Sequence, residues 1–174
     1  MTSTIASTLG HTVPLTVGAA LLVFAALHDF AARTIPNFVC AAVAVLGLLL
    51  RAADDQLLPA VLISAVIFAL CTACWLRGWM GGGDVKLLTA AALFVPPMTV
   101  GNMIVATSLF GGVVAICYLV ARYFAQRVTL RLHPAPRHFL ARVLRAEHWR
   151  LLRGSPLPYG SAIAAGTLSV IISG

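Results

Sequence analysis

Long apolar segments alternate with short polar ones along the whole chain. The apolar segments run from about 14 to 32, 37 to 50, 57 to 76, 85 to 95, 102 to 121 and 157 to 172. A membrane-spanning helix needs about 20 mainly apolar residues, and an open strand cannot satisfy its backbone hydrogen bonds in lipid. The pattern therefore predicts an all-α integral membrane protein, a polytopic bundle of about six transmembrane helices, with residues 1–174 forming a single domain.

The second and fourth segments are shorter than a full span. At about 1.5 Å per residue, residues 85–95 cover only about half of a hydrocarbon core of roughly 30 Å. Two explanations are open. Either this helix continues past Pro96 and Pro97 with a kink, or its start lies below the membrane surface and is shielded by other parts of the protein.

The composition supports the membrane assignment. Hydrophobic residues make up 60% of the chain, charged residues make up 10%, and the mean hydropathy is +0.97, whereas soluble domains have about 45–50% apolar and about 25% charged residues. A soluble enzyme and a disordered chain are thereby excluded. The net charge of +7 would suggest nucleic acid in a soluble protein, but here the basic residues flank apolar segments, and we expect no nucleic-acid partner.

The basic residues also predict the orientation. Alternating the six spans places eleven basic residues on one side and only Arg51 on the other. Basic residues favour the cytoplasmic side of a membrane, so we expect a multi-pass protein of the cytoplasmic (inner) membrane with both termini outside. The eleven are Arg33, Arg77, Lys86, Arg122, Arg127, Arg131, Arg137, Arg142, Arg145, Arg150 and Arg153.

The longest predicted loop, residues 122–156, holds eight of the twelve basic residues. Apolar residues recur within it at helical spacing, with arginines between them. This pattern is typical of an amphipathic helix that lies on anionic membrane lipid. A solvated basic linker that only enforces the topology is the other interpretation.

Only five acidic residues are present, and two of them are candidates for chemistry. Asp54 and Asp55 fall in an outward loop and are expected to be solvated, and Glu147 has basic neighbours. Asp29 and Asp84 remain, both at the membrane edge on the predicted cytoplasmic side. Ionisable residues at this depth are costly, which makes them functional candidates by default.

Each aspartate also has a purely structural interpretation. Asp29 could pair with Arg33 four residues later on the same helix, and Asp84, which follows three glycines, could be the N-cap of the fourth helix. If the two carboxylates instead approach in a low-dielectric site, one proton is shared between them. Such a pair activates a water molecule and polarises a peptide carbonyl, as in aspartic proteases.

Three motifs carry a resemblance to a known family. The segment 81–88, GGGDVKLL, resembles the GxGD motif of the type IV prepilin peptidases, and the segment 29–37, DFAARTIPN, resembles the first aspartate motif of that family. Near the last span, Pro158, Tyr159 and Gly160 resemble a further family element, although Ser161 stands where proline is frequent.

The resemblance implies a membrane-embedded aspartic endopeptidase that cleaves the leader of prepilins at the cytoplasmic face. Its substrate has a basic leader followed by an apolar helix, and no cofactor or metal is expected. Asp29 and Asp84 are then the catalytic residues. The supporting residues are Gly81, Gly82, Gly83, Lys86, Arg33, Pro36, Asn37, Pro158, Tyr159 and Gly160. Nothing in the sequence indicates an oligomeric state.

The cysteines favour the short form of this family. Longer members, which also N-methylate their product, carry a zinc-binding segment with paired CxxC motifs. Here the one CxxC, Cys71 and Cys74, lies inside an apolar segment, where two small buried residues on one helix are the simplest interpretation. A zinc site needs about four ligands. The chain therefore resembles the form found with tight-adherence (Flp/Tad) pilus systems, without methyltransferase activity.

The supporting residues have less specific interpretations. Lys86 could contact the substrate or a lipid phosphate, or could act only as a topology signal. Pro36 and Asn37 are expected to start the second helix. Arg33 could tune Asp29 or anchor the helix, and His28 is expected to be a polar residue at a span end.

Other classes of function use similar residues. Presenilin-type proteases pair GxGD with a Tyr-Asp motif, but His28 precedes Asp29 here and six spans are too few. An archaeal-type preflagellin peptidase fits the same motifs. The non-enzymatic alternatives are a small carrier or proton pathway that uses the two aspartates, and an assembly protein that tolerates asparagine at both positions.

Overall fold

The computed structural model describes the backbone of residues 2–127 and 157–173, and the side chains of residues 11–124 and 157–173. Within these ranges the chain is helical and contains no strand, which confirms the predicted all-α class. The elements are α1 (Thr2–Ala32), α2 (Asn37–Ala53), α3 (Leu57–Leu76), α4 (Gly82–Phe94), the 3-10 helix η1 (Pro97–Thr99), α5 (Val100–Arg127) and α7 (Tyr159–Ser173).

The observed helices follow the apolar segments, with differences at their ends. The third segment coincides with α3, whereas α1 begins earlier than predicted and α5 continues to Arg127. Residues 122–127 therefore belong to a helix and not to the long loop. The rest of that loop, residues 128–156 with its predicted surface helix, lies outside the described residues.

The short fourth helix ends before the two prolines. Val95 already has an extended backbone (φ −85°, ψ 155°), as expected for a residue that precedes proline. The chain then turns through η1 into α5. A kinked continuation past Pro96 and Pro97 is thus wrong. The other explanation is supported, because Val85 and Leu87 near the start of α4 are buried.

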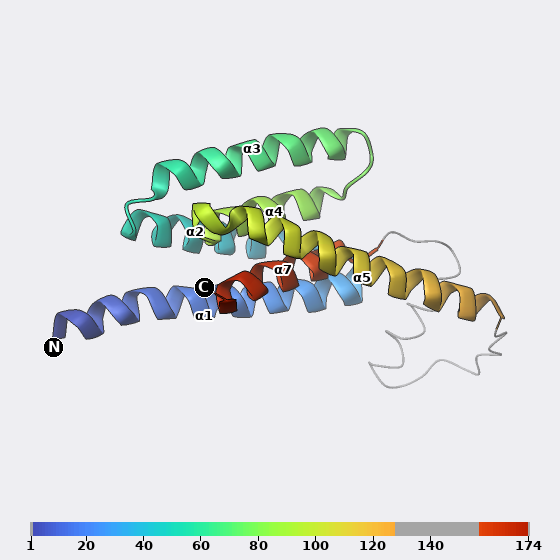
Figure 1. The fold of residues 1–174 in the computed structure, drawn as a ribbon, viewed down its shortest axis with the longest axis horizontal. Coiled ribbons are helices and arrows are strands. Elements are labelled where there is room, and N and C mark those ends of the chain that lie inside the picture. Colours follow the sequence, from blue (N-terminus) through green and yellow to red (C-terminus); the bar gives the residue numbers. More distant parts are fainter. Residues whose placement is uncertain (1, 128–156, 174) are drawn as a thin grey trace.

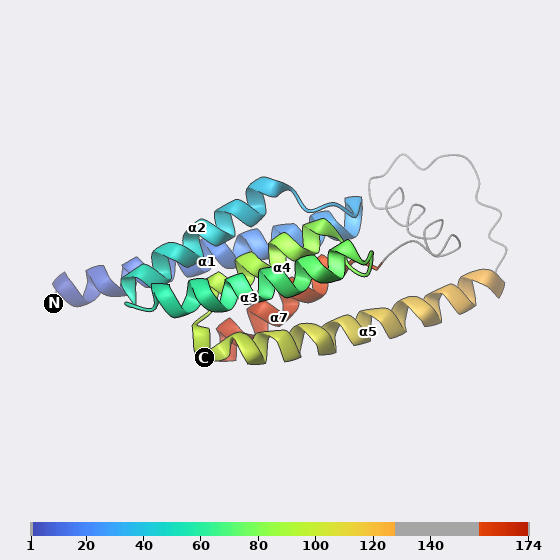
Figure 2. The ribbon, with the colours of Figure 1, turned by 90° about the horizontal axis from the view of Figure 1, so that it is seen from above.

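Helix α4 is short because it occupies the centre of the bundle. It packs against α2, α3 and α7, while α1 packs against α2 and α7, and α5 packs mainly against α7 (Figures 1 and 2). The core therefore surrounds α4, and small side chains such as Ala90, Ala91 and Ala92 allow its neighbours to approach.

Two glycines allow helix backbones to meet closely. A Cβ atom at Gly47 of α2 would lie 2.8 Å from the backbone of Leu93 and Phe94 in α4. A Cβ atom at Gly166 of α7 would lie 2.6 Å from the backbone nitrogen of Thr107 in α5. Any larger residue at either position would force the helices apart, because both contacts are with backbone or buried atoms.

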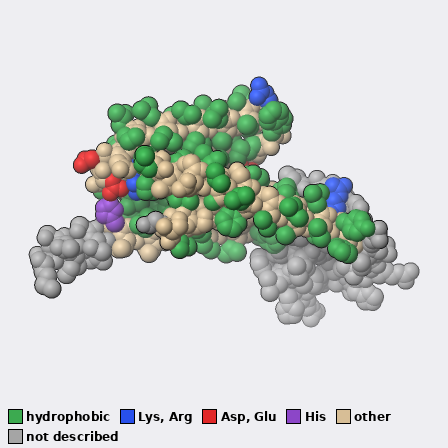
Figure 3. All heavy atoms as spheres, viewed as in Figure 1, with side chains coloured by type: hydrophobic (Ala, Val, Ile, Leu, Met, Phe, Trp, Pro, Cys, Tyr) green, Lys and Arg blue, Asp and Glu red, His purple; other side chains and the backbone are tan. Residues whose placement is uncertain are grey.

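The outer surface of the bundle is apolar. Three helical segments are long and apolar enough to cross a membrane, namely His11–Ala32, Leu57–Leu76 and Pro97–Phe124, and two shorter apolar helices accompany them. Hydrophobic side chains cover most of the face seen in Figure 3, and the charged side chains visible there lie towards its ends. The protein is therefore a membrane protein.

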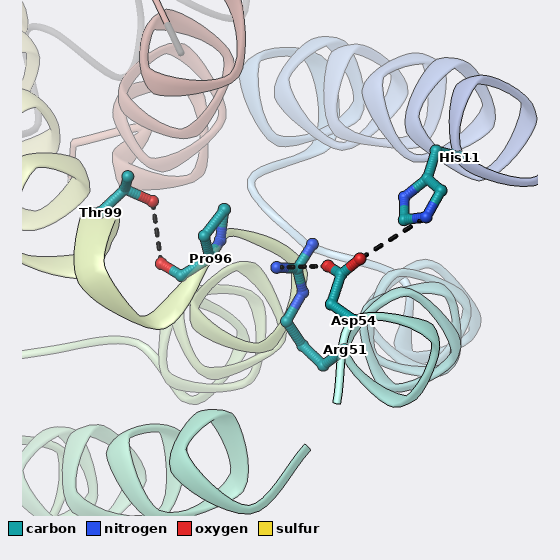
Figure 4. Close-up of polar contacts among 5 residues, drawn as sticks. All are labelled: His11, Arg51, Asp54, Pro96 and Thr99. Atoms are coloured by element: carbon teal, nitrogen blue, oxygen red, sulfur yellow. Dashed lines mark hydrogen bonds and ion pairs between the residues drawn. The ribbon is translucent and has the colours of Figure 1, made fainter. Parts of the chain in front are cut away.

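The two ends of the bundle carry different polar groups. The left end in Figure 1 holds Arg51 and Asp54 at the end of α2 and His11 of α1. An Asp54 oxygen lies 3.0 Å from Arg51 Nη1 and the other lies 3.5 Å from His11 Nε2 (Figure 4). The Asp54 side chain is 27% exposed, and its pairing with Arg51, which is only 5% exposed, is a contact that the sequence did not predict.

Candidate active site

Asp29 lies in the last turn of α1 and is only 6% exposed. The backbone N–H of Gly160 donates a hydrogen bond of 2.9 Å to its Oδ2 atom. Gly160 is the second residue of α7, and the first N–H groups of a helix have no partner within the helix. The carboxylate of one helix thus caps the start of another, at the end of α7 that carries partial positive charge.

Gly160 must lack a side chain at this contact. A Cβ atom there would lie 2.9 Å from Asp29 Oδ2 and 2.9 Å from the Cδ1 atom of Ile35. Its neighbour Pro158 is fully buried, and Tyr159 packs against Gly111 of α5. These contacts explain why a proline, a tyrosine and a glycine stand together at the start of α7.

Asp84 lies in the first turn of α4, three residues after the N-cap residue Gly81. The prediction that Asp84 is itself the N-cap is therefore wrong. The backbone at Gly81 is extended (φ −74°, ψ 142°) and the helix starts at Gly82. The Asp84 carboxylate reaches back to the backbone N–H of Gly81, which is the arrangement of an acidic side chain at the third helical position.

Ile35 holds the two aspartate segments together. It lies in the linker between α1 and α2, and a Cβ atom at Gly83 would be 3.4 Å from its Cβ atom. The same side chain contacts Gly160 on α7. The starts of α4 and α7 therefore pack on one isoleucine, and their glycines allow the close approach.

The two aspartates face one cavity, which we call the site cavity. It has a volume of about 350 Å³ and is lined by Asp29, Arg33, Asn37, Asp84, Lys86 and Leu157, among others. The carboxylates of Asp29 and Asp84 are close enough to interact electrostatically. The topology thus brings together, at the right end of the bundle in Figure 1, the two acids that the sequence singled out.

Arg33 connects the end of α1 to α5. It has a left-handed backbone (φ 56°) just after α1. Its Nη2 donates a hydrogen bond of 2.5 Å to the Tyr118 hydroxyl, and its guanidinium lies 5.1 Å from the centre of the Tyr118 ring. Both contacts stabilise the position of α5 over the site. Tyr118 was not singled out by the sequence, where it is one aromatic residue in a long apolar segment.

Two hydrogen bonds stabilise the linker between α1 and α2, and they involve Lys86, Asn37 and His28. The Lys86 Nζ donates a hydrogen bond of 3.0 Å to the Asn37 side-chain oxygen. Asn37 is the first residue of α2 after the N-cap Pro36, as predicted. His28 Nδ1 lies 2.7 Å from the carbonyl oxygen of Thr34, and because a carbonyl only accepts, Nδ1 is the donor. His28 thus fixes the linker in addition to ending a span.

The described residues contain no group of three or more His, Cys, Asp and Glu side chains that could hold a metal ion. Cys71 and Cys74 are partly exposed on α3 and line a second cavity. The interpretation of this pair as two buried residues is therefore wrong, because both are of intermediate exposure. Ile35 is a further residue whose role the sequence did not predict, although it lies inside the motif at 29–37.

A buried and a partly buried carboxylate that line one cavity are chemically suited to acid–base work. One ionised carboxylate can take a proton from water while its protonated partner donates to a carbonyl oxygen. Arg33 and Lys86 add two positive charges to the lining of the site cavity. With one proton shared between the two carboxyl groups, the pair carries one negative charge against the two positive charges of Arg33 and Lys86.

Comparison with known proteins identifies the family. The model of the type IV leader peptidase family matches residues 16–116, from α1 to the middle of α5, and includes both aspartate motifs. No curated protein and no solved structure matches the chain. Since the match covers more than half of the chain, this membrane protein belongs to the type IV leader peptidase family, a family of proteases.

Proposed function

We propose that the protein is an aspartic endopeptidase that removes the short basic leader of prepilins at the cytoplasmic face of the inner membrane. One observation carries this proposal, namely that Asp29 and Asp84 line one cavity at one end of the bundle. Family membership supports the peptidase activity. The distribution of basic residues supports an orientation with this end in the cytoplasm.

In the proposed mechanism the two carboxyl groups hold one proton between them. The ionised carboxylate removes a proton from water, and the water oxygen attacks the carbonyl carbon of the scissile peptide. The protonated carboxyl group donates its proton to the carbonyl oxygen. The tetrahedral intermediate then collapses. The carboxyl group that took the water proton gives it to the leaving nitrogen, the other carboxylate takes a proton from a hydroxyl of the intermediate, and the C–N bond breaks. Each turnover consumes one water and returns the pair to its starting state.

The proposal includes the short, tight-adherence (Flp/Tad) form of the family. The chain has a single CxxC sequence, Cys71 and Cys74, and it lies on α3 within a candidate membrane span. A methyltransferase activity that depends on a zinc segment with paired CxxC motifs is therefore not part of the proposed function. The proposed site residues need neither a metal nor a cofactor.

The test is cleavage of a purified prepilin in membranes by the wild type and by Asp29→Asn and Asp84→Asn. Loss of an acid–base group is expected to reduce the rate by about 10²–10⁴-fold in each variant. Asp55→Asn is the matched control. Asp55 is exposed and lies at the opposite end of the bundle, and asparagine tolerates its left-handed backbone.

All four proteins are first compared for insertion and for thermal unfolding. Cleavage at one position by the wild type and the control, with both site variants inactive, is the expected result. Normal cleavage by the two asparagine variants would contradict the proposed mechanism. A wild type that leaves the prepilin intact would contradict the proposed substrate.

A further inference from the structure

A second cavity adjoins the site cavity and meets it at Asp84. We call it the lateral cavity. It has a volume of about 610 Å³, and its walls include Cys71 and Cys74 of α3, Leu88 of α4, Ile104 and Ser108 of α5, and Tyr159 of α7. Gly81, Asp84 and Leu157 line both cavities. One carboxylate of the candidate pair thus lies where the two spaces join.

The two cavities differ in chemistry. Arg33, Lys86 and both aspartates line the site cavity, whereas Asp84 is the only charged residue on the described walls of the lateral cavity. The other walls of the lateral cavity are mostly apolar. Its volume falls in the range of about 300–1,000 Å³ that is typical of binding pockets.

The lateral cavity opens at the side of the bundle. Helix α3 packs on α4 and helix α5 packs on α7, and Figure 2 shows α5 leaving the bundle, away from α3, towards its C-terminal end. Ile104 is 40% exposed and Tyr159 is 36% exposed. A partner that moves within the membrane can therefore reach Asp84 between α3 and α5 without passing through the core.

The walls suit a helix as the occupant. Ile104, Thr107, Ser108 and Gly111 share one face of α5, because residues three and four positions apart are neighbours on a helix. Cys71 and Cys74 are three apart on α3. The cysteines of α3 and Thr107 and Ser108 of α5 are small lining residues, and small side chains let a helix backbone approach closely in a membrane.

We propose that the apolar helix that follows the scissile bond of the substrate docks in the lateral cavity between α3 and α5. This inference rests on the proposed function, since it names where that substrate binds. A chain cut at Asp84 has a polar and an apolar part on the two sides of the cut. The polar leader then lies on the side of the site cavity, whose walls are polar, and the apolar helix lies on the side of the lateral cavity, whose walls are mostly apolar.

The four native cysteines allow a direct test by disulfide cross-linking. Cys71 and Cys74 line the lateral cavity. Cys40 lines a separate surface groove near α2 and α4, and Cys117 is exposed on α5 outside the lateral cavity. A disulfide forms only when the two Cα atoms lie about 4.4–6.8 Å apart, so the cysteine that reacts reports the position of the substrate helix.

The substrate is a prepilin with one cysteine, placed in turn at three adjacent positions in the first two turns of its apolar helix. Two enzyme variants are compared, and both carry Asp29→Asn to prevent cleavage. The first also carries Cys40→Ser and Cys117→Ser and so retains Cys71 and Cys74. The second also carries Cys71→Ser and Cys74→Ser and so retains Cys40 and Cys117. After oxidation in membranes, the enzyme that retains Cys71 and Cys74 is expected to give at least tenfold more adduct. Adducts that require Cys40 or Cys117, or no adduct at Cys71 and Cys74 from any of the three positions, would overturn the proposal.

A second measurement uses otherwise wild-type enzyme and a matched pair of substitutions on α5. Ser108→Trp fills the lateral cavity and is expected to raise the KM for the prepilin at least tenfold. Leu109→Trp enlarges the adjacent side chain, which is 67% exposed on the outer face of the helix, and is expected to change the KM less than twofold. An equal KM in the two variants would show that the substrate helix does not occupy the lateral cavity and would overturn the proposal. Cleavage of the prepilin by the wild type tests the proposed function separately.

Discussion

The two ends of the bundle hold their acidic groups in opposite ways. At the left end in Figure 1, Asp54 pairs with Arg51 at 3.0 Å and with His11 at 3.5 Å. At the other end, Asp29 accepts the backbone N–H of Gly160, while Arg33 donates to the hydroxyl of Tyr118. One acid contacts charged side chains, and the other is held by a neutral backbone donor.

The difference separates structural acids from chemical ones. Removing a carboxylate that pairs with a buried arginine leaves an uncompensated buried charge and destabilises the protein, so the role of Asp54 is structural. Backbone donors position a carboxylate without supplying a full charge. An acid held in this way stays in place while its proton comes and goes, which the proposed mechanism requires of Asp29 and Asp84.

The largest expected effect on cleavage in this comparison is that of Gly160→Ala. The new Cβ atom would lie 2.9 Å from Asp29 Oδ2 and from Ile35, so Asp29 must move away from the start of α7. We expect prepilin cleavage to fall about 100-fold, because a shift of about 1 Å in a reacting group costs about that much.

The matched control for Gly160→Ala is Gly112→Ala on α5, where nothing lies within 4 Å of the added Cβ atom. This variant is expected to cleave within twofold of the wild type. Equal rates for the two alanine variants would show that the contact between Asp29 and Gly160 does not position the carboxylate.

The dependence of the cleavage rate on pH is expected to rely on the acids at the site end of the bundle and not on Asp54 at the other end. A pair that works with one shared proton loses its base when both carboxyl groups are protonated, and loses its acid when both are ionised. We expect kcat/KM to form a bell, falling about tenfold per pH unit on each limb. Asp54→Asn, measured in the same buffers, is expected to leave both limbs where they are. A rate that rises steadily with pH would contradict a shared proton.

Asp54→Asn is expected to act on stability and not on cleavage. The substitution removes the carboxylate that pairs with Arg51, whose side chain is 6% exposed. The Asp54 side chain is 27% exposed, so water screens part of this interaction. We expect a loss of about 1–2 kcal/mol after allowance for solvent screening. Thermal unfolding in detergent measures it as a Tm lowered by several degrees. An unchanged Tm together with slower cleavage would show that Asp54 acts in cleavage and not in stability, and would contradict this comparison.

The smallest effect is expected for Tyr118→Phe. Phenylalanine keeps the ring beneath the Arg33 guanidinium and removes only the hydroxyl that accepts its hydrogen bond. A hydrogen bond to a charged group contributes about 1.5–3 kcal/mol at most when buried, and this one is partly exposed. Cleavage should fall two- to fivefold. Tyr123→Phe, the same substitution at a residue of α5 that is 52% exposed, serves as the control.

The sequence predicts the positions of the helices better than the contacts between them. Apolar segments of known length identify α3 to the residue and place Asp29 and Asp84 at the same end of the bundle. Helix ends are less well predicted, because α5 continues through Arg122 and Arg127 once its apolar segment has ended. A polar residue continues a helix at little cost where the helix leaves the bundle.

The rest depends on tertiary contacts that no local pattern encodes. The carboxylate of Asp29 meets Gly160 across 131 residues, and Ile35 packs between two glycines from other helices. Asp54 looked solvated because its loop is polar, yet the nearby Arg51 is buried by neighbouring helices. The resemblance to a family motif predicts a role for Gly160. No sequence pattern predicts the role of Tyr118 or the presence of the lateral cavity.

The contact between Asp29 and Gly160 also has a consequence for the order of biosynthesis. Asp29 lies on α1, which is synthesised well before α7, and the N–H group that holds it belongs to α7. The pair of acids therefore lacks one of its supports until α7 has entered the membrane. A nascent chain that carries both aspartates but has not yet inserted α7 therefore lacks the backbone donor that holds Asp29.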